Sequence, residues 1–336
     1  INRLKRFFHL PGDLENERRA EAIRKNIRGA RSTGGTLEQM QRKNEHSWIR
    51  CVSLVIETRP DYATTHYARE MLRLGCTKVE VGVQSVFDEP LRKMERGHGV
   101  EESIRATRIL KDFGFKVTYH IMPGLPGSTL EQDKEMFEIL FSDERFKPDM
   151  LKIYPTVVVK GTELYDWWRK GRYEPYRLED LITLLAKAKM NLPPYVRIQR
   201  IMRAIPATLI EAGCKHSNLR QVVQEKLDAH NEKCNCIRCR EYGIVERRRG
   251  IKEGSLEDVE SCRMDYEASS GREIFLSYEN KNQDYLVGYL RLRKPSDHAH
   301  RPELNDGKTM IVREIKVVGE LVPTDAEPRT LAQLQH

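Results

Sequence analysis

Short apolar runs alternate with longer amphipathic stretches through the first half of the chain. The apolar runs lie at residues 51–57, 78–83, 116–121 and 150–154, and each has the length and branching of a buried strand. Between them, residues 63–74, 100–113 and 130–140 carry apolar side chains at helical spacing. Strands and helices that alternate in this way are typical of βαβ units. The pattern predicts an α/β domain with a parallel sheet, in the form of a complete or partial barrel.

The last quarter of the chain has a different pattern. Residues 273–278, 285–293 and 310–318 alternate apolar and polar side chains, which indicates antiparallel strands with one buried face. We therefore expect three parts: an α/β barrel over 1–190, a linker over 191–268, and a second domain with antiparallel strands over 269–336.

Polar side chains follow four consecutive strands of the predicted barrel. A single polar residue at a strand end is usually a helix cap or a sheet-edge hydrogen bond, but four such ends in a row favour a ligand pocket, because barrel chemistry lies at the carboxyl ends of the strands. Residues 123–127 (PGLPG) would turn the backbone sharply beside that pocket. The strand-end residues are Glu57, Arg59, Gln84, His120, Lys152 and Tyr154.

Three cysteines lie within six residues of the linker: Cys234, Cys236 and Cys239. This spacing lets the sulfurs converge on one thiophilic ion and predicts a structural zinc site, although three unrelated cysteines would be the alternative. Tetrahedral zinc needs a fourth ligand. The sequence does not choose among the candidates His230, Cys262, His216 and Cys214.

Composition narrows the class of protein. The net charge of +8 and pI near 9.0 favour an acidic partner, with nucleic acid first. No apolar stretch approaches the roughly 20 residues of a membrane span, so we expect no membrane association. Cysteines grouped at metal spacing favour a reducing compartment, and hence a cytoplasmic protein.

Several short motifs resemble those of a known family. ETRPD (57–61), GVQS (82–85), RGH (96–98) and HIMPGLPG (120–127) resemble radical S-adenosylmethionine (SAM) enzymes. The match becomes more specific with KIYPTVVVKGTELY (152–165), GRYEPY (171–176), RIQRIMRAIP (197–206), SNLR (217–220) and CNCIRCRE (234–241). Together, in this order, they resemble the catalytic subunit of Elongator in its archaeal or bacterial form, from about residue 36 to the last residue.

The resemblance implies a fold and an activity. It implies a partial TIM-like radical SAM barrel, a zinc-binding linker, and an incomplete acetyltransferase-like (GNAT-like) α+β domain. The implied reaction places a carboxymethyl group on C5 of the wobble uridine of tRNA, with acetyl-CoA as substrate and SAM and a [4Fe–4S] cluster as cofactors. A protein lysine acetyltransferase and a non-catalytic tRNA-binding scaffold are the alternatives. A homodimer or accessory subunits are left open.

The sequence departs from the family at two places. It has no Cys-x₄-Cys-x₂-Cys motif, and Cys51 and Cys76 stand alone, so we expect the cluster ligands outside this chain. Ala204 stands where the family generally has Asp. Gln335 and His336 resemble the first two positions of the turn that binds the CoA pyrophosphate in GNAT domains.

The resemblance also implies roles for single residues. Glu57, Arg59 and Gln84 would hold SAM, and His120, Lys152 and Tyr154 would line the reaction chamber. The backbone of Glu314, Ile315, Lys316 and Val317 would contact the pantetheine arm of acetyl-CoA. Any one basic residue is more often a solvated surface charge, but as a group six are expected to bind tRNA phosphates. They are Lys152, Lys160, Arg172, Arg197, Arg200 and Arg203.

Overall fold

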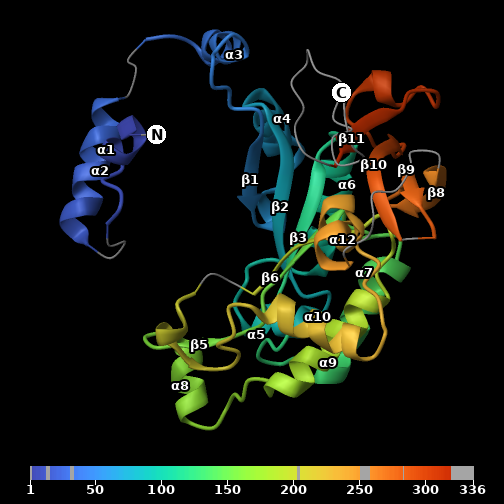
Figure 1. The fold of residues 1–336 in the computed structure, drawn as a ribbon. Coiled ribbons are helices and arrows are strands. Elements are labelled where there is room, and N and C mark those ends of the chain that lie inside the picture. Colours follow the sequence, from blue (N-terminus) through green and yellow to red (C-terminus); the bar gives the residue numbers. More distant parts are fainter. Residues whose placement is uncertain are drawn as a thin grey trace. The chain divides into compact units, whose positions relative to one another are not determined.

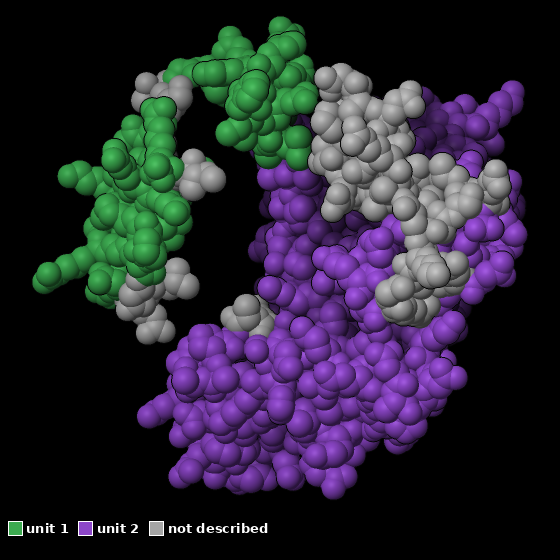
Figure 2. All heavy atoms as spheres, viewed as in Figure 1, with its two compact units in different colours: residues 1–52 green, residues 53–336 purple. Residues whose placement is uncertain are grey.

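The computed structural model describes residues 2–12, 16–30, 34–202, 205–249, 258–282 and 284–318. Arg203, Ala204, Gln335 and His336 lie outside these residues, so the expectations that rest on them stay predictions. The chain groups into two compact units, residues 1–52 and 53–336 (Figure 2). None of the described helices is long and apolar enough to cross a bilayer.

The first unit contains three polar helices: α1 (Asn2–Phe7), α2 (Glu17–Gly29) and α3 (Leu37–Glu45). None of their described residues is buried. Their starts are fixed locally. The Asn16 side chain accepts a hydrogen bond from the backbone N–H of Arg19, and Thr36 caps α3, because such side chains satisfy the free N–H groups of a first turn.

The second unit is built on a five-stranded parallel sheet with the order β1-β2-β3-β4-β6 (Figure 1). This confirms the expected α/β domain with a parallel sheet. The four expected strands are present, and β6 is an additional edge strand. The bounds are β1 (Leu54–Thr58), β2 (Cys76–Gln84), β3 (Lys116–Ile121), β4 (Met150–Ile153) and β6 (Arg197–Ile201).

Helices connect the parallel strands and cover the sheet. Neighbouring side chains of β3 such as Val117 and Thr118, which point to opposite faces, are both fully buried, as expected for a parallel strand with both faces covered. Thr129 begins α7 with a capping box that includes Gln132. The helices of this region are η1 (Pro60–Tyr62), α4 (Thr65–Arg73), α5 (Asp88–Lys93), α6 (Val100–Asp112), α7 (Leu130–Ser142), α8 (Glu163–Arg169) and α9 (Leu178–Met190).

Beyond the parallel sheet the chain forms a small two-stranded sheet and a helical segment. The strands β5 (Val158–Val159) and β7 (Ile210–Ala212) are antiparallel. They are followed by α10 (Leu219–Ala229), α11 (Ile237–Arg240) and α12 (Tyr242–Arg249), and η2 (Ala207–Leu209) precedes β7. The backbone N–H of Ile237 donates to the carbonyl of Val196, 2.9 Å away, which ties α11 to the residue before the edge strand β6.

The C-terminal part is a four-stranded antiparallel sheet with the order β11-β10-β9-β8. The expected antiparallel strands are confirmed, and β8 is an additional one. Its start at Glu260 lies before the expected domain boundary at 268/269; that boundary and the one at 190/191 stay predictions. The bounds are β8 (Glu260–Ala268), β9 (Gly271–Asn280), β10 (Tyr285–Lys294) and β11 (Ile311–Val317), with η4 (Pro302–Leu304) between the last two.

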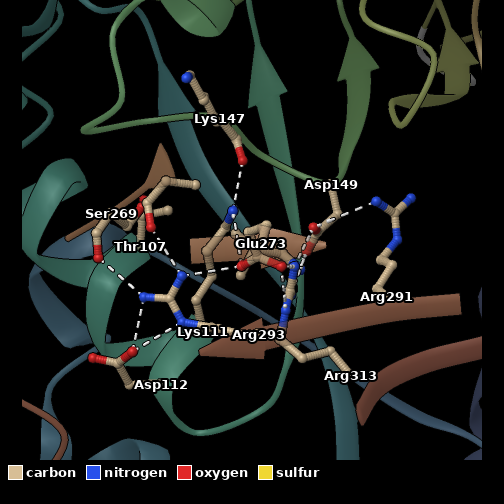
Figure 3. Close-up of polar contacts among 12 residues, drawn as sticks. Thr107, Lys111, Asp112, Lys147, Asp149, Ser269, Glu273, Arg291, Arg293 and Arg313 are labelled. Carbon is tan, nitrogen blue, oxygen red and sulfur yellow. Dashed lines mark hydrogen bonds and ion pairs between the residues drawn. The ribbon is translucent and has the colours of Figure 1, made fainter. Parts of the chain in front are cut away.

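A buried network of charged side chains joins this sheet to the parallel domain (Figure 3). Arg313 donates to both Asp149 oxygens, at 2.6 and 2.7 Å, and to Glu273 at 2.8 Å. Arg293 donates to Asp112 at 2.8 Å and to Glu273 at 3.0 Å. We call this set the junction network. It comprises four cations and four carboxylates: Lys111, Arg291, Arg293, Arg313, Asp112, Asp149, Glu273 and Glu314.

Burial by itself favours the uncharged form of each of these groups, but the opposite charges beside them favour the charged form. Burial raises the pKa of Asp149, and the nearby Arg313 and Lys111 outweigh this and hold it below its usual range. Burial lowers the pKa of Lys111 to about 8, although Glu273 and Asp149 favour its charged form. The Lys111 ammonium also donates to the backbone carbonyl of Lys147, 2.7 Å away. The junction is therefore a matched set of charges rather than an apolar interface.

Candidate functional site

A polar cluster lies at the carboxyl ends of the parallel strands, centred on His120 near the end of β3. Its Nδ1 is 3.3 Å from Oε1 of Glu57 on β1, and its Nε2 is 3.0 Å from Oε2 of Glu80 on β2. Lys152 on β4, which pairs with His120 in the sheet, donates to the same oxygen of Glu80. The structure thus brings the expected Glu57, His120 and Lys152 together around Glu80. We call these four residues the strand-end cluster.

Glu80 is held ionised within this cluster. Burial raises the pKa of this carboxyl, but hydrogen bonds from His120, Lys152 and Lys78 outweigh burial and keep the pKa well below its usual range. The Lys78 ammonium lies 3.1 Å from Oε1 of Glu80. The buried carboxylate of Glu80 therefore orients His120 and Lys152. The side chain of Glu57, by contrast, is 62% exposed.

Tyr154 adds an aromatic wall beside His120. The two ring centroids are 5.3 Å apart, with the rings nearly perpendicular. The backbone N–H of Tyr154 donates to the carbonyl of Ile121 at 2.8 Å, so the chain beyond β4 stays attached to β3. All three residues expected to line the reaction chamber are therefore within one neighbourhood.

The other expected SAM residues follow β1 and β2. Gln84 ends β2 with a φ of 67°, and its side-chain Oε1 is buried and has no hydrogen-bond partner among the described residues. Arg59 is paired with Asp61 at 2.5 Å and lies 5.4 Å above the ring of Tyr62. Gly97 beside the Arg59 guanidinium has a φ of 70°, a left-handed backbone conformation that favours glycine.

The PGLPG loop is held by side chains that the sequence did not single out. Oδ2 of Asp133, on α7, accepts hydrogen bonds from the backbone N–H of Gly124 at 2.6 Å and from the Tyr176 hydroxyl at 2.7 Å. The Tyr173 hydroxyl donates to the Gly124 carbonyl at 2.8 Å. Burial raises the pKa of Asp133 to about 6, although its two donors act in the opposite direction. The GRYEPY segment therefore clamps this loop.

The three cysteines of the linker converge. The Sγ atoms of Cys234, Cys236 and Cys239 lie within 4.8 Å of one another, and Cys236 is fully buried at the start of α11. Three grouped thiols fit a thiophilic ion. Among the described residues no further Cys, His, Asp or Glu ligand atom joins this group. The four candidates for the fourth ligand stay open; His230, for one, bonds through Nδ1 to the carbonyl of Lys226 at 2.8 Å.

The residues expected to bind tRNA differ in their surroundings. Lys160, Arg172 and Arg200 are exposed. Arg197 is instead half-buried and forms a two-pronged ion pair with Glu241, in which one N–O distance is 3.1 Å. Its guanidinium thus already has an internal partner, and its role in tRNA binding stays a prediction.

The residues expected to contact acetyl-CoA form the end of β11, the first strand in the sheet order. Glu314 to Val317 pair with Arg291 to Gly288 of β10 on one side. The Glu314 carboxylate accepts from Arg291 at 2.9 Å, and the Lys316 ammonium donates to Glu241 at 3.3 Å. Ile315 is 75% exposed. An edge strand is the kind of element that can offer backbone groups to a ligand.

Comparison with known proteins agrees with this architecture. The model of the Radical SAM superfamily matches residues 12–140, and that of the Radical_SAM C-terminal domain matches residues 148–229. A protein of Methanocaldococcus jannaschii named tRNA uridine(34) acetyltransferase is 50% identical over 288 residues, which are 86% of this chain and 53% of that protein. Human Elongator complex protein 3 is 41% identical over 303 residues, which are 90% of this chain and 55% of that protein.

A solved structure extends the comparison to three dimensions. Archaeal Methanocaldococcus infernus Elp3 with an N-terminal deletion (1–46) superimposes with a TM-score of 0.82 and 46% sequence identity, over 90% of this chain and 70% of that one. This chain spans about half the length of the full relatives that it matches. The resemblance inferred from the motifs is confirmed: the chain belongs to the Elp3 family, within the radical SAM superfamily.

Proposed function

We propose that this chain is part of an enzyme that modifies the wobble uridine of tRNA, using acetyl-CoA and radical SAM chemistry to place a carboxymethyl group on C5 of the base. Two archaeal relatives at 49–50% identity are named tRNA uridine(34) acetyltransferase. The observation that supports the proposal most directly is the strand-end cluster, since parallel α/β folds place their chemistry at this end of the sheet.

The finer description of the fold is part of the proposal. The five parallel strands with connecting helices suit a partial TIM-like barrel. The antiparallel sheet that ends in β11 suits the first part of a GNAT-like domain, and the cysteine trio suits a structural zinc site in the linker between them. Zinc would cross-link Cys239 of α11 to Cys234 and Cys236, which precede this helix, because a structural ion holds its ligands together.

SAM fits the carboxyl ends of β1 and β2. The buried Oε1 of Gln84 has no partner there in the described structure, and a buried acceptor of this kind gains free energy from a ligand donor. Glu57 and Arg59 would hold the charged groups of the same molecule. When bound and given one electron by the intact enzyme, SAM would supply a carbon radical that can take a hydrogen atom from an acetyl methyl group.

The iron–sulfur cluster finds no matching ligands in this chain. Cys76 is the first residue of β2, so it lies toward the amino end of this strand, opposite the candidate site, and Cys51 belongs to the first compact unit. The trio in the linker has the spacing and burial of a structural site. We therefore assign no residue to the cluster and derive no step through it.

The strand-end cluster would bind and position the reacting groups. The ionised Glu80 accepts from the Lys152 side chain and fixes its direction, so that Lys152 can face a phosphate or a developing oxyanion. His120, between two carboxylates, would hold a proton at Nδ1 or Nε2, and Tyr154 would exclude water on one side.

The two substrates, acetyl-CoA and tRNA, would bind to different elements of the fold. The backbone of β11 at Glu314–Val317 would hold the pantetheine arm of acetyl-CoA. The tRNA would lie on exposed basic residues, with Lys160, Arg172 and Arg200 the best placed of those expected. A cytoplasmic location and a homodimer or accessory subunits remain expectations from the sequence.

The test is hydrolysis of acetyl-CoA by the intact protein, with and without tRNA that carries a wobble uridine. We expect strong stimulation by this tRNA and none by unrelated RNA or protein. An equal rate of acetyl-CoA hydrolysis with and without tRNA would contradict the proposal and favour a protein lysine acetyltransferase. Tight tRNA binding without any stimulated hydrolysis would favour a scaffold.

A further inference from the structure

The helical segment after β7 forms an open pocket that plays no part in the proposed site. Its volume is about 290 Å³, and it lies among α10, α11 and α12. Four arginines line it, and the cysteine trio touches it through Cys239. We call it the arginine pocket and define it by Arg220, Arg238, Arg247, Arg248, Gln224 and Cys239.

The charges of this pocket are not matched. Arg248 pairs with Asp228 at 3.0 Å. Within the described parts of the chain, Arg220, Arg238 and Arg247 form no ion pair with a carboxylate. This is the opposite of the junction network, where each arginine faces at least one carboxylate. Unpaired guanidinium groups that converge on one cavity form a site for an anion.

The three unpaired arginines are held in place by backbone carbonyls. Arg220 donates to the carbonyl of Ile198 at 2.7 Å, and Arg238 donates to that of Gln199 at 3.0 Å. Arg247 donates to the carbonyl of Gly243 at 2.8 Å. A guanidinium has five N–H donors in a fixed fork, so each arginine is oriented by one bond and keeps others for a ligand.

The cysteine trio alone does not account for so much positive charge. A zinc ion bound to three thiolates carries one negative charge, and Asp228 carries one more. The four arginines therefore leave the pocket positively charged even when the metal site is filled. Phosphate suits this set best, because its oxygens accept paired hydrogen bonds from arginine forks.

The position of the pocket relates it to the parallel sheet. Ile198 and Gln199, which anchor Arg220 and Arg238, are neighbours on the edge strand β6. The next residue, Arg200, is exposed on the same strand. A polyanion bound in the pocket thus lies beside a strand that runs toward the carboxyl edge where the strand-end cluster is found.

We propose that the arginine pocket binds phosphate groups of the tRNA substrate and so fixes the RNA alongside β6. This inference rests on the proposed function and adds to it a binding site. None of the four arginines is among the residues that the sequence suggested for tRNA binding.

The test compares two double variants of the intact protein that lose the same charge. Arg238→Gln with Arg247→Gln removes two pocket arginines. Arg263→Gln with Arg301→Gln removes two exposed arginines of the C-terminal part, each paired with a nearby carboxylate. The measurement is the dissociation constant for wobble-uridine tRNA between about 50 and 200 mM salt, where phosphate contacts set the slope.

We expect the pocket variant to bind tRNA about tenfold more weakly and to lower the salt slope by roughly one to two. The control should stay within about twofold of the wild type. Arg238→Lys with Arg247→Lys should keep most of the salt slope, because lysine retains the charge, but should lose part of the affinity, because the fork is gone.

Three results would overturn the inference. Unchanged affinity and slope in the pocket variant, with a wild type that binds tRNA, would exclude the pocket while the proposed function stands. Weaker binding of acetyl-CoA with tRNA binding intact would assign the pocket to the phosphates of the coenzyme. Loss of zinc in the pocket variant, measured by metal analysis, would show that the arginines serve the thiolates. A wild type that binds no tRNA would instead reject the proposed function itself.

Discussion

The strand β4 connects two clusters of charged side chains that differ in almost every respect. Asp149 immediately precedes the strand and belongs to the junction network, whereas Lys152 lies within it and belongs to the strand-end cluster. In the junction network, the charged side chains are at most 10% exposed and each one has an opposite charge within 4 Å. In the strand-end cluster, Glu57 is 62% exposed and Lys152 is 21% exposed.

The difference separates charges that build the fold from charges that await a ligand. In the junction network every charge is already paired, so a bound ligand would add no favourable interaction. A cluster that is open on one side gains from one, and on the same strand as Glu80 the amide oxygen of Gln84 has no partner among the described residues. Burial alone would have ranked the junction network above the strand-end cluster as a functional site, since Lys111, Asp149 and Arg293 are completely buried.

The largest effect should follow from breaking the junction network. Arg313→Met leaves Asp149 and Glu273 buried without their main partner, and breaking a buried pair in this way costs about 3–5 kcal/mol. The measurement is the free energy of unfolding of the intact protein in denaturant. The control is Arg263→Met on β8, whose ion pair is exposed and should matter by less than about 1 kcal/mol. Equal stability of the two variants would show that the network is not structural.

A smaller effect on stability should come from Asp133 and should depend on pH. Its folded pKa of about 6 lies above the value near 4 of an unfolded aspartate, so the folded state binds the proton more tightly. Stability is therefore favoured below about pH 4 and decreases as pH rises through 6, by about 3 kcal/mol in all.

The matching variant is Asp133→Asn, whose amide oxygen can still accept from Gly124 and Tyr176 but does not titrate. Unfolding measured at steps between pH 4 and 7 should show the decrease in the wild type and not in this variant. Asp166→Asn, on the exposed side of α8, should follow the wild type. Parallel curves for the wild type and Asp133→Asn would remove Asp133 as the cause.

The third prediction concerns activity. Glu80→Gln removes the charge that positions Lys152 and His120, and misplaced groups at a reacting centre cost on the order of 100-fold in rate. The measurement is tRNA-stimulated hydrolysis of acetyl-CoA, with melting temperature as the check on folding. Glu70→Gln, in an exposed pair with Arg73, should retain full activity. Normal turnover in the Glu80→Gln variant would show that the strand-end cluster is structural, and it would then not differ in role from the junction network.

Much of the fold could be predicted from the sequence because its signals are local. The strand at Lys116–Ile121 has the predicted bounds, and α6 begins at the predicted Val100. The strand β6 was not predicted, since RIQRI is short and strongly charged. Its place in the sheet depends on pairing with β4, some fifty residues earlier in the chain.

The candidate site was predicted in part for the same reason. Residues that end strands can be identified from the pattern, and His120, Glu57 and Lys152 do meet. Glu80 was missed because it lies in the middle of β2, where alternation gives no sign that it faces His120 rather than solvent. The junction network was missed because its partners are 20 to 181 residues apart in the sequence, and no periodic pattern indicates a contact over such separations.

The junction network has a mechanical consequence. A shift of the C-terminal strands by one residue would exchange inward and outward side chains and leave the buried arginines without their carboxylates. The charge pairs are therefore compatible with only one register of this sheet. The spacing between the β11 edge and the carboxyl ends of the parallel strands is then a constant of the folded unit. Under the proposed function, the flexible arm of CoA must span that spacing.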